Sequence, residues 1–310
     1  MLESFFIVGQ QVVVLFLLIF LGYFCSKAKL LNQPTISGIT NLVLYIVTPC
    51  ILITSFQREF DVLMLGNLGI ALLIATGFHL LNILFAHLFV HDPQMRRQRV
   101  LRFGVIFSNA GYMSLPLQDA ILGADGVFYG AAVIAVFNLL AWTYGLVLMG
   151  GDIKLISLRN LVLNPVVTGV SIGLVLFLLS INLPYIIKEP MQMMAALNTP
   201  LPMLVIGFYL AESQIVHVLT DLNVYLVLFL RLLAVPLIML AIVKMAGVTD
   251  HTMIVACVIA ASAPCAAMTT MFASKFNQDT ELSVGIVSFS TIVSIVTMPL
   301  VVGLARYLTM

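Results

Sequence analysis

Charged residues are scarce in this chain. Only 9% of its 310 residues are Asp, Glu, Lys or Arg, whereas a soluble globular domain carries about 25%. Hydrophobic residues make up 62%, and they gather in runs of about 20 residues, the length of a helix that crosses a bilayer. These runs lack the alternation of barrel strands. The composition therefore excludes a soluble domain and predicts an all-α polytopic membrane protein. Its net charge of +1 argues against a nucleic-acid partner.

Motifs for nucleotides, metals and catalysis are also sparse. No GxxxxGK[ST] sequence is present, so no ATP site is expected. An intramembrane enzyme would need HExxH, or Gly-x-Ser-x-Gly with a histidine base, at membrane depth, and we predict no such set. The cysteines have no CxxC spacing, and we interpret them as packing residues. They are Cys25, Cys50, Cys257 and Cys265. We therefore expect no enzymatic activity, no cofactor and no metal.

Ten membrane spans joined by short loops can be drawn along the chain. They cover approximately 5–25, 36–56, 63–89, 100–120, 125–149, 160–181, 190–210, 222–244, 251–274 and 281–307. The odd-numbered loops hold most of the basic residues, namely Lys27, Lys29, Arg96, Arg97, Arg99, Lys154, Arg159 and Lys275. Because basic loops stay in the cytoplasm, both termini are predicted to lie outside it.

The stretch Ile106–Pro116 interrupts its apolar run. Gly111 and Pro116 weaken a continuous helix, and Asn109 needs hydrogen-bond partners that lipid does not offer. A second stretch of this kind, Ser262-Ala263-Pro264-Cys265, lies in the other half of the chain. Irregular backbone at membrane depth survives only inside protein or beside a wet cavity, and carriers bind substrates there. We predict that two broken helices, the fourth and the ninth, meet and cross.

The two halves of the chain correspond weakly in sequence. When the two halves are aligned with a constant offset in residue number, Ser108 aligns with Ser262 and Gly111 with Cys265. The same alignment places Gln10 beside Asn164. The helix-breaking Pro49 then falls near Pro200. Because five helices per half is an odd number, the second half would enter the membrane from the opposite side. We expect two inverted five-helix repeats, 1–149 and 160–310, joined by a short cytoplasmic linker, 150–159.

An ordered set of short motifs resembles the auxin efflux carrier family, in particular its compact bacterial members that are described as malate or malonate permeases. The motifs are Asn41-Leu42-Val43 with Thr48-Pro49-Cys50 and Ser55; Phe107 to Leu117; Ala263-Pro264 with Ala273 and Asp279; and Ser290-Thr291 with Ser294, Thr297 and Pro299. The resemblance implies ten helices in two inverted repeats, substrate bound beside the crossing, and a homodimer. The chain departs from the family at Ser114, where a glycine is usual.

The substrate-binding candidates lie at and near the two breaks. The Asn109 amide donates to a carboxylate or coordinates a cation, and the alternative is that it satisfies backbone groups freed by the break. The N–H groups at the new helix end suit an anion. The full set is Asn109, Gly111, Ser108, Pro264, Cys265, Gln10 and Asn164. The prolines Pro116, Pro264, Pro49 and Pro200 are expected to shape the breaks.

Arg231, His79 and Asp119 are candidates for coupling or ion pairing. Arg231 is the only basic residue well inside an apolar run, and we interpret it as snorkelling or pairing with an acid such as Asp221 rather than binding substrate. His79 could carry a proton, but local hydrogen bonding is the stronger interpretation. Asp119 flanks the end of the fourth helix, where a loop or cap role is favoured over an ion site.

These observations predict a secondary carrier of the bacterial inner membrane that moves a small organic anion by alternating access. The expected cargo is a dicarboxylate or an auxin-like carboxylate. A coupling ion is a further expected partner, either a proton or sodium, with the proton slightly favoured. The alternatives are a passive anion channel or uniporter and a membrane sensor that does not transport.

Overall fold

The computed structural model describes residues 2–157, 159, 163–212 and 218–309. The predicted all-α class is confirmed, since the described residues form helices and only one isolated β-bridge. The α-helices are α1 (Leu2–Lys27), α2 (Gln33–Leu42), α3 (Thr48–Ser55), α4 (Val62–Phe89), α5 (Met95–Ile106), α6 (Leu115–Leu140), α7 (Leu146–Gly150), α9 (Pro165–Leu178), α10 (Tyr185–Ala196), α11 (Pro200–Glu212), α12 (Leu222–Phe229), α13 (Val235–Met245), α14 (His251–Ser262), α15 (Met268–Lys275) and α16 (Thr280–Thr309).

Seven helical runs among the described residues are long and apolar enough to cross a membrane. They are Phe6–Lys27, Gln33–Ser55, Val62–Phe89, Ala110–Gly150, Tyr185–Glu212, Leu222–Met245 and Thr280–Thr309. All but the fourth coincide with an expected span. That run of 41 residues combines the end of one expected span with the whole of the next, and its backbone at Gly123 has φ +64° and ψ −155°. Only glycine adopts this conformation readily, so the run is two helices joined at a kink.

The remaining expected spans are short or divided. The span drawn at 160–181 is α9, Pro165–Leu178, and its first residues lie outside the part that the structure describes. The span drawn at 251–274 is α14 followed by α15, with a non-helical segment between them.

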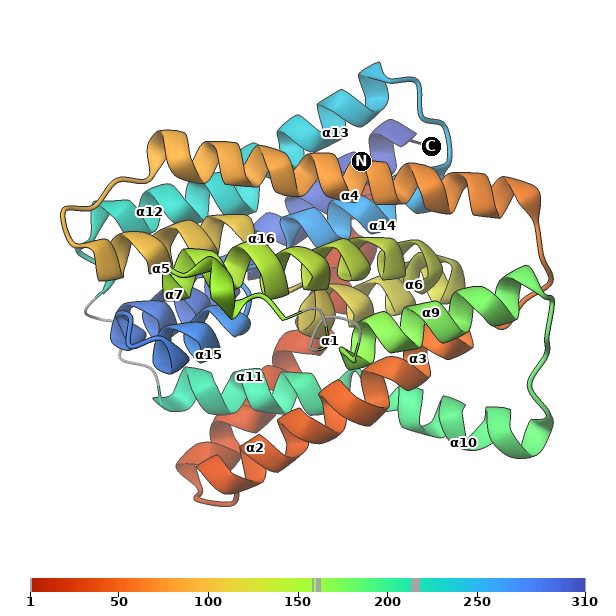
Figure 1. The fold of residues 1–310 in the computed structure, drawn as a ribbon, viewed down its shortest axis with the longest axis horizontal. Helices are drawn as coiled ribbons and strands as arrows, with labels where there is room; N and C mark the ends of the chain where they lie inside the picture. Colours follow the sequence, from red (N-terminus) through yellow and green to blue (C-terminus); the bar gives the residue numbers. More distant parts are fainter. Residues whose placement is uncertain (1, 158, 160–162, 213–217, 310) are drawn as a thin grey trace.

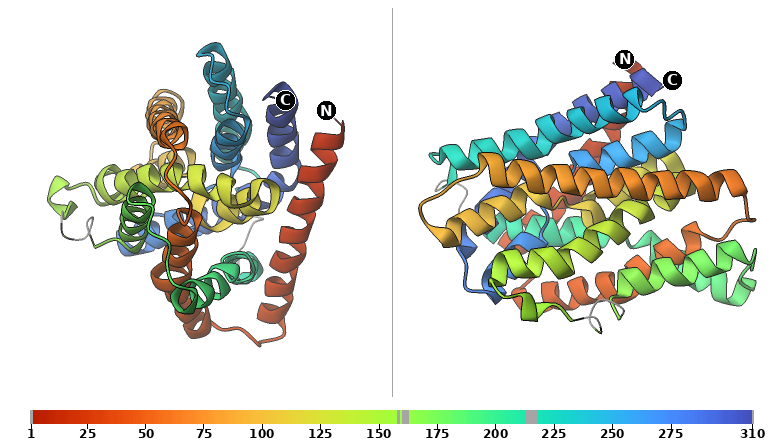
Figure 2. Two further views of the ribbon diagram at one scale, coloured as in Figure 1. Left: turned by 90° about the vertical axis from the view of Figure 1, so that its right-hand side faces the viewer. Right: turned by 45° about the horizontal axis from the view of Figure 1, so that its top comes forward.

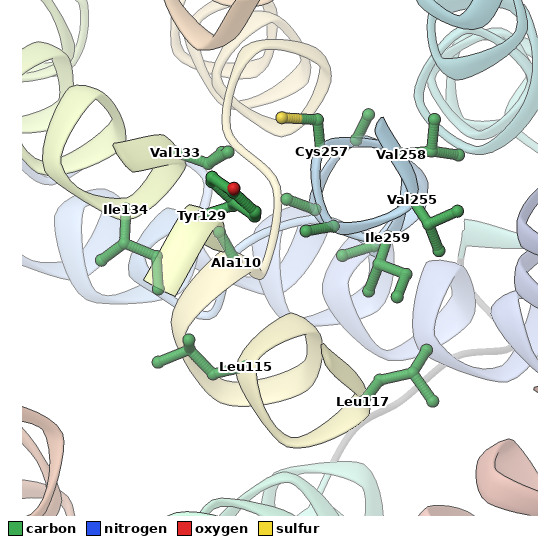
Figure 3. Packing of buried hydrophobic residues seen from close by; sticks show 14 of the residues in the cluster. Ala110, Leu115, Leu117, Tyr129, Val133, Ile134, Val255, Cys257, Val258 and Ile259 are labelled. Atoms are coloured by element: carbon green, nitrogen blue, oxygen red, sulfur yellow. The ribbon is translucent and has the colours of Figure 1, made fainter. Parts of the chain in front are cut away.

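The helices form a central group flanked on two sides. α4 and α13 lie along one side of the molecule, α2, α10 and α11 lie along the other, and α5, α6, α14 and α16 lie between them (Figure 1). The two ends of the chain lie next to each other (Figure 2). α14 packs along α6, and Figure 3 shows Ile259 of α14 on the same side as Leu117 at the start of α6, whereas Leu115 extends to the other side of that turn.

Three helices accommodate proline by widening one turn. Each of the π-helical turns at Val43–Val47, Ala110–Ser114 and Leu230–Ala234 is followed by one other residue and then by a proline. Proline lacks an N–H and clashes with the carbonyl four residues before it, and a π turn removes that clash. Pro49 therefore does not break its helix, contrary to the expectation, because α2 and α3 run on continuously through the π turn between them.

α1 and α11 touch backbone to backbone. A Cβ atom added at Gly207 would lie 2.0 Å from the carbonyl oxygen of Ile19 and 2.6 Å from the amide nitrogen of Tyr23. A Cβ at Gly22 would lie 2.5 Å from the Leu204 carbonyl oxygen. Small residues allow such approach, and close packing rather than water exclusion holds helices together in lipid.

We predict that Gly207→Ala lowers stability by about 1–3 kcal/mol, because the two helices must separate to admit the methyl group. Thermal unfolding of the purified protein in detergent measures the change. Gly77→Ala on α4 is the matched control, since nothing lies within 4 Å of a Cβ there. Equal melting temperatures for the two variants would show that the contact contributes little.

Candidate functional site

Two helix interruptions lie against each other in the centre of the molecule. α5 ends at Ile106 and helix resumes at Ala110, whereas α14 ends at Ser262 and α15 starts at Met268. The Asn109 N–H donates to the Pro264 carbonyl at 2.7 Å, and the Ala266 N–H donates to the Phe107 carbonyl at 2.9 Å. The interrupted segments thus satisfy each other's backbone groups, which lipid does not do.

The two interruptions have different local causes. Ala263 precedes a proline and is extended, with φ −64° and ψ 148°, as expected for that position. The first interruption holds no proline, and it begins at Phe107, before Gly111 and Pro116. Those two residues lie instead in the π turn and in the first turn of the helix that follows. At this interruption, hydrogen bonds to the other segment therefore replace helical hydrogen bonds that the backbone does not make.

Arg231 binds the C-terminal ends of the two interrupted helices. Its Nε donates to the Ala263 carbonyl and its Nη1 to the Val105 carbonyl, both at 3.2 Å, and its Nη2 donates to the Ala261 carbonyl. The side chain is fully buried, and its guanidinium lies over the Phe78 ring, 5.0 Å from the centroid.

The snorkelling or acid-pairing interpretation of Arg231 was wrong. Asp221 caps α12 and pairs with Arg97. Arg231 turns inward to backbone oxygens because helix C-termini carry partial negative charge. An arginine fork matches several oxygens at once.

The N-terminal ends of the resumed helices face a cavity of about 400 Å³. Ala110 and Gly111 border it from one helix, and Ala267 and Met268 border it from the other. The first N–H groups of a helix have no partner within the helix and carry partial positive charge. Among the described residues, no Asp, Glu, Lys, Arg or His lines this cavity.

The cavity wall also presents buried polar atoms without partners. Neither the Ser108 Oγ nor the Asn109 Nδ2 has a hydrogen-bond partner among the described residues, and both side chains line the cavity. Asn109 is only 5% exposed. Buried polar groups are almost always paired, so unpaired ones that border a cavity indicate a ligand or water there.

The other predicted binding residues are spread around this centre. Cys265 forms the β-bridge with Ser108 and donates its N–H to Ser290 Oγ at 3.1 Å, so it lies behind the cavity wall, as does Pro264. Gln10 is exposed on α1 and does not border the cavity. Asn164 caps α9 and donates to Asn138 Oδ1 at 3.3 Å.

The remaining candidates also lie off the cavity. Pro200 begins α11 after a short turn at 197–199. His79 is fully buried, bonds its Nδ1 to the Ala75 carbonyl at 2.8 Å and packs against Phe78, Phe107 and Phe137. Asp119 is exposed on α6, before the Gly123 kink.

Sequence reasoning missed several polar residues of the cavity wall. Asn138 lines it from α6, and the others come from the second, seventh and tenth expected spans: Thr40, Thr48, Tyr209, Ser288 and Thr291. Asn138 had a usable signal, because it is the sole amide in the apolar stretch 125–149. Thr48 and Thr291 had a signal as well, because they belong to the motifs that resemble the family, whereas Thr40, Tyr209 and Ser288 had none, since hydroxyl groups commonly bond their own helix.

A Gly-x-Ser-x-Gly sequence does occur in the chain, at 169–173, but it is not an enzyme's nucleophile motif. That motif requires a sharp strand-to-helix turn, whereas Ser171 lies inside α9 and is exposed. Gly169 and Gly173 allow α9 to approach Pro49 and Phe56, with a Cβ at Gly173 falling 2.8 Å from the Phe56 ring. The expectation that this sequence pattern is absent was therefore wrong. The two glycines of the pattern allow close helix packing.

Comparison with known families agrees with a transport site. A model of the membrane transport protein family matches residues 7–156 and 151–302. The chain belongs to that family, the auxin efflux carriers. The family consists of membrane transporters, and this member is a multi-pass membrane protein. No curated protein matches the chain.

We predict that Thr270→Cys reacts with a small water-soluble thiol reagent, whereas Thr269→Cys does not. Thr270 borders the cavity and is half-buried, but its neighbour Thr269 is fully buried away from it. Both variants are made without Cys25 and Cys50, the partly exposed cysteines. Mass spectrometry after a timed exposure measures the modified fraction, and equal labelling at the two positions would contradict the cavity's boundaries.

Proposed function

We propose that this carrier moves a small organic anion by alternating access at the paired interruptions. One observation carries the proposal: the protein neutralises the C-terminal helix ends with its own Arg231 and leaves the N-terminal ends facing an uncharged cavity. The unbalanced field in that cavity is positive, so the ligand that complements it is an anion.

The proposed architecture is two inverted five-helix repeats, 1–149 and 160–310, joined by 150–159. Its fourth span is α5 with the helix from Ala110, and its ninth is α14 with α15. These are the two broken helices that cross. Support comes from the backbone hydrogen bonds between the interruptions and from the Gly123 kink, which allows α6 to supply two spans.

The ligand carboxylate is proposed to bind between the first N–H groups of the two resumed helices. The Asn109 Nδ2 and the Ser108 hydroxyl have no partner among the described residues, and we propose that they donate to it. Each helix end contributes about 0.3–1 kcal/mol when exposed and up to about 2 kcal/mol when partly buried. An anion is then held without a dedicated arginine or lysine.

The remainder of the cavity favours one carboxylate on an apolar body over a dicarboxylate. Ile134, Phe137 and Val205 line it, and Tyr112 and Tyr209 add aromatic surface. A second carboxylate would lie against these side chains with no cation among the described wall residues to pair with it, at a high desolvation cost. Within the two expected cargo classes, an auxin-like acid therefore fits better.

The cavity lies between two sets of helices, as alternating access requires. Thr40, Val166 and Tyr209 come from α2, α9 and α11 on one side, and Asn138 and Thr291 come from α6 and α16 on the other. Movement of one set against the other exposes the same site to each face of the membrane in turn. The expected setting is the bacterial inner membrane, with both termini outside the cytoplasm and a homodimer as the assembly.

We predict that Asn109→Ala lowers saturable uptake into proteoliposomes by about tenfold or more, since a hydrogen bond to a charged group is worth about 1.5–3 kcal/mol. Radiolabelled indole-3-acetate, malonate and malate are the probes. Gln10→Ala is the matched amide control, because Gln10 is exposed away from the cavity. Both variants should melt at the temperature of the unmodified protein.

The outcomes separate the candidate functions. Normal uptake by the Asn109 variant would remove that amide from the site. Uptake that does not saturate at modest concentrations would indicate a passive channel. Binding of the labelled acids without uptake would indicate a sensor.

A further inference from the structure

The three carbonyl groups that bind Arg231 form a cation site. They belong to Val105, at the C-terminal end of α5, and to Ala261 and Ala263, at and just beyond the end of α14. In carriers built on discontinuous helices, unwound carbonyls and half-helix C-terminal ends are where coupling cations bind. Here a protein side chain already holds those oxygens.

We propose that Arg231 is a tethered cation that takes the place of a coupling cation, so that transport by this protein needs no sodium. The part of this inference that concerns transport rests on the proposed function. The part that concerns the site does not, because the carbonyl cluster and the guanidinium are present whatever the cargo is.

The charges at the site balance with Arg231 alone. A helix C-terminus is equivalent to roughly −0.5 elementary charge, so two such ends together present about one negative charge. The guanidinium supplies one positive charge, and the described salt bridges give it no carboxylate partner. An added sodium ion would leave the site with a net positive charge in a medium of low dielectric constant, which is costly.

The shape of the side chain fits this role. The carbonyl oxygens come from three residues of two separate segments, and the planar fork of an arginine reaches all of them through three different nitrogens. The Phe78 ring covers the guanidinium face at 5.0 Å from its centroid. The side chain is fully buried, so it has the surroundings of a bound ion rather than of a residue in contact with water.

A positive charge that is fixed to the protein also affects the driving force for transport. With the compensating charge fixed to the protein, each transported anion crosses with its own charge and without a companion sodium ion. The membrane potential then acts directly on the cargo, at about 2.3 kcal/mol per charge per 100 mV. Arg231 is a positioning residue in this account, since it holds the two helix ends together and lies outside the cavity wall.

The first test uses purified protein in detergent and no substrate. Arg231→Ala should lower the melting temperature by on the order of 10 °C, because it leaves the carbonyls unpaired. Guanidinium or ethylguanidinium at millimolar concentration, present from solubilisation onward, should restore a large part of that loss. Tetramethylammonium should not, since it has no N–H to donate. Arg102→Ala is the control, an arginine that donates to the single carbonyl of Val90.

Arg231→Lys and Arg231→Met complete the series. The lysine variant keeps a charge and should retain more stability than the methionine variant, which fills similar space without one. Equal stability of these two variants, together with no rescue of Arg231→Ala by either guanidinium compound, would overturn the tethered-cation assignment and leave Arg231 as a packing residue.

The second test compares initial uptake rates of the unmodified carrier in sodium and in N-methylglucamine media. Equal rates are expected, with a dependence on an imposed potassium-diffusion potential. A rate that falls by tenfold without sodium would overturn the proposed sodium independence even if the rescue succeeds. If none of the labelled acids is transported in either medium, the proposed function fails, and the rescue experiment still decides the role of Arg231.

Discussion

The fold depends on how one guanidinium group holds two helix ends inside a membrane. Four helix ends meet at the centre of this molecule, and a low-dielectric environment gives their partial charges large effects. Arg231 neutralises the two negative ends, and the backbone pairing of Asn109 with Pro264 keeps the four together. The remaining pair of ends, with its positive field, faces the cavity. Stability and the proposed recognition of an anion thus have one electrostatic origin.

The cavity follows from this arrangement. Because the positive field comes from backbone N–H groups, the side chains of the wall remain apolar or carry only hydroxyl and amide groups. Ser108 and Asn109 lie where the chain leaves the pairing and enters the helix, and both border the cavity beside that helix end. The family match agrees with a transport role for such a cavity.

The sequence predicted the all-α membrane class, the family and the region of the interruptions, because composition, long apolar runs and ordered motifs are local signals. It attributed the first interruption to Gly111 and Pro116, whereas the helix already ends before Phe107, because the pairing that permits the interruption comes from residues far along the chain. It also misread Arg231, whose partners are carbonyl groups of two other helices. Pro49 was expected to break a helix, and a π turn accommodates it instead. Each error involves backbone geometry or long-range contacts that residue types alone do not record.

The main-chain origin of the positive field affects how such a protein changes over evolutionary time. A carrier that recognises its anion through an arginine loses that recognition by one substitution. Here the N–H groups of Gly111 and Met268 are present whichever side chains those positions carry. Substitutions at Ile134, Phe137 or Tyr209 alter the shape of the cavity and leave the helix ends unchanged. If the proposed site binds an acid, descendants of one gene can therefore exchange one acid for another in few steps while conserving the capacity to hold an acid.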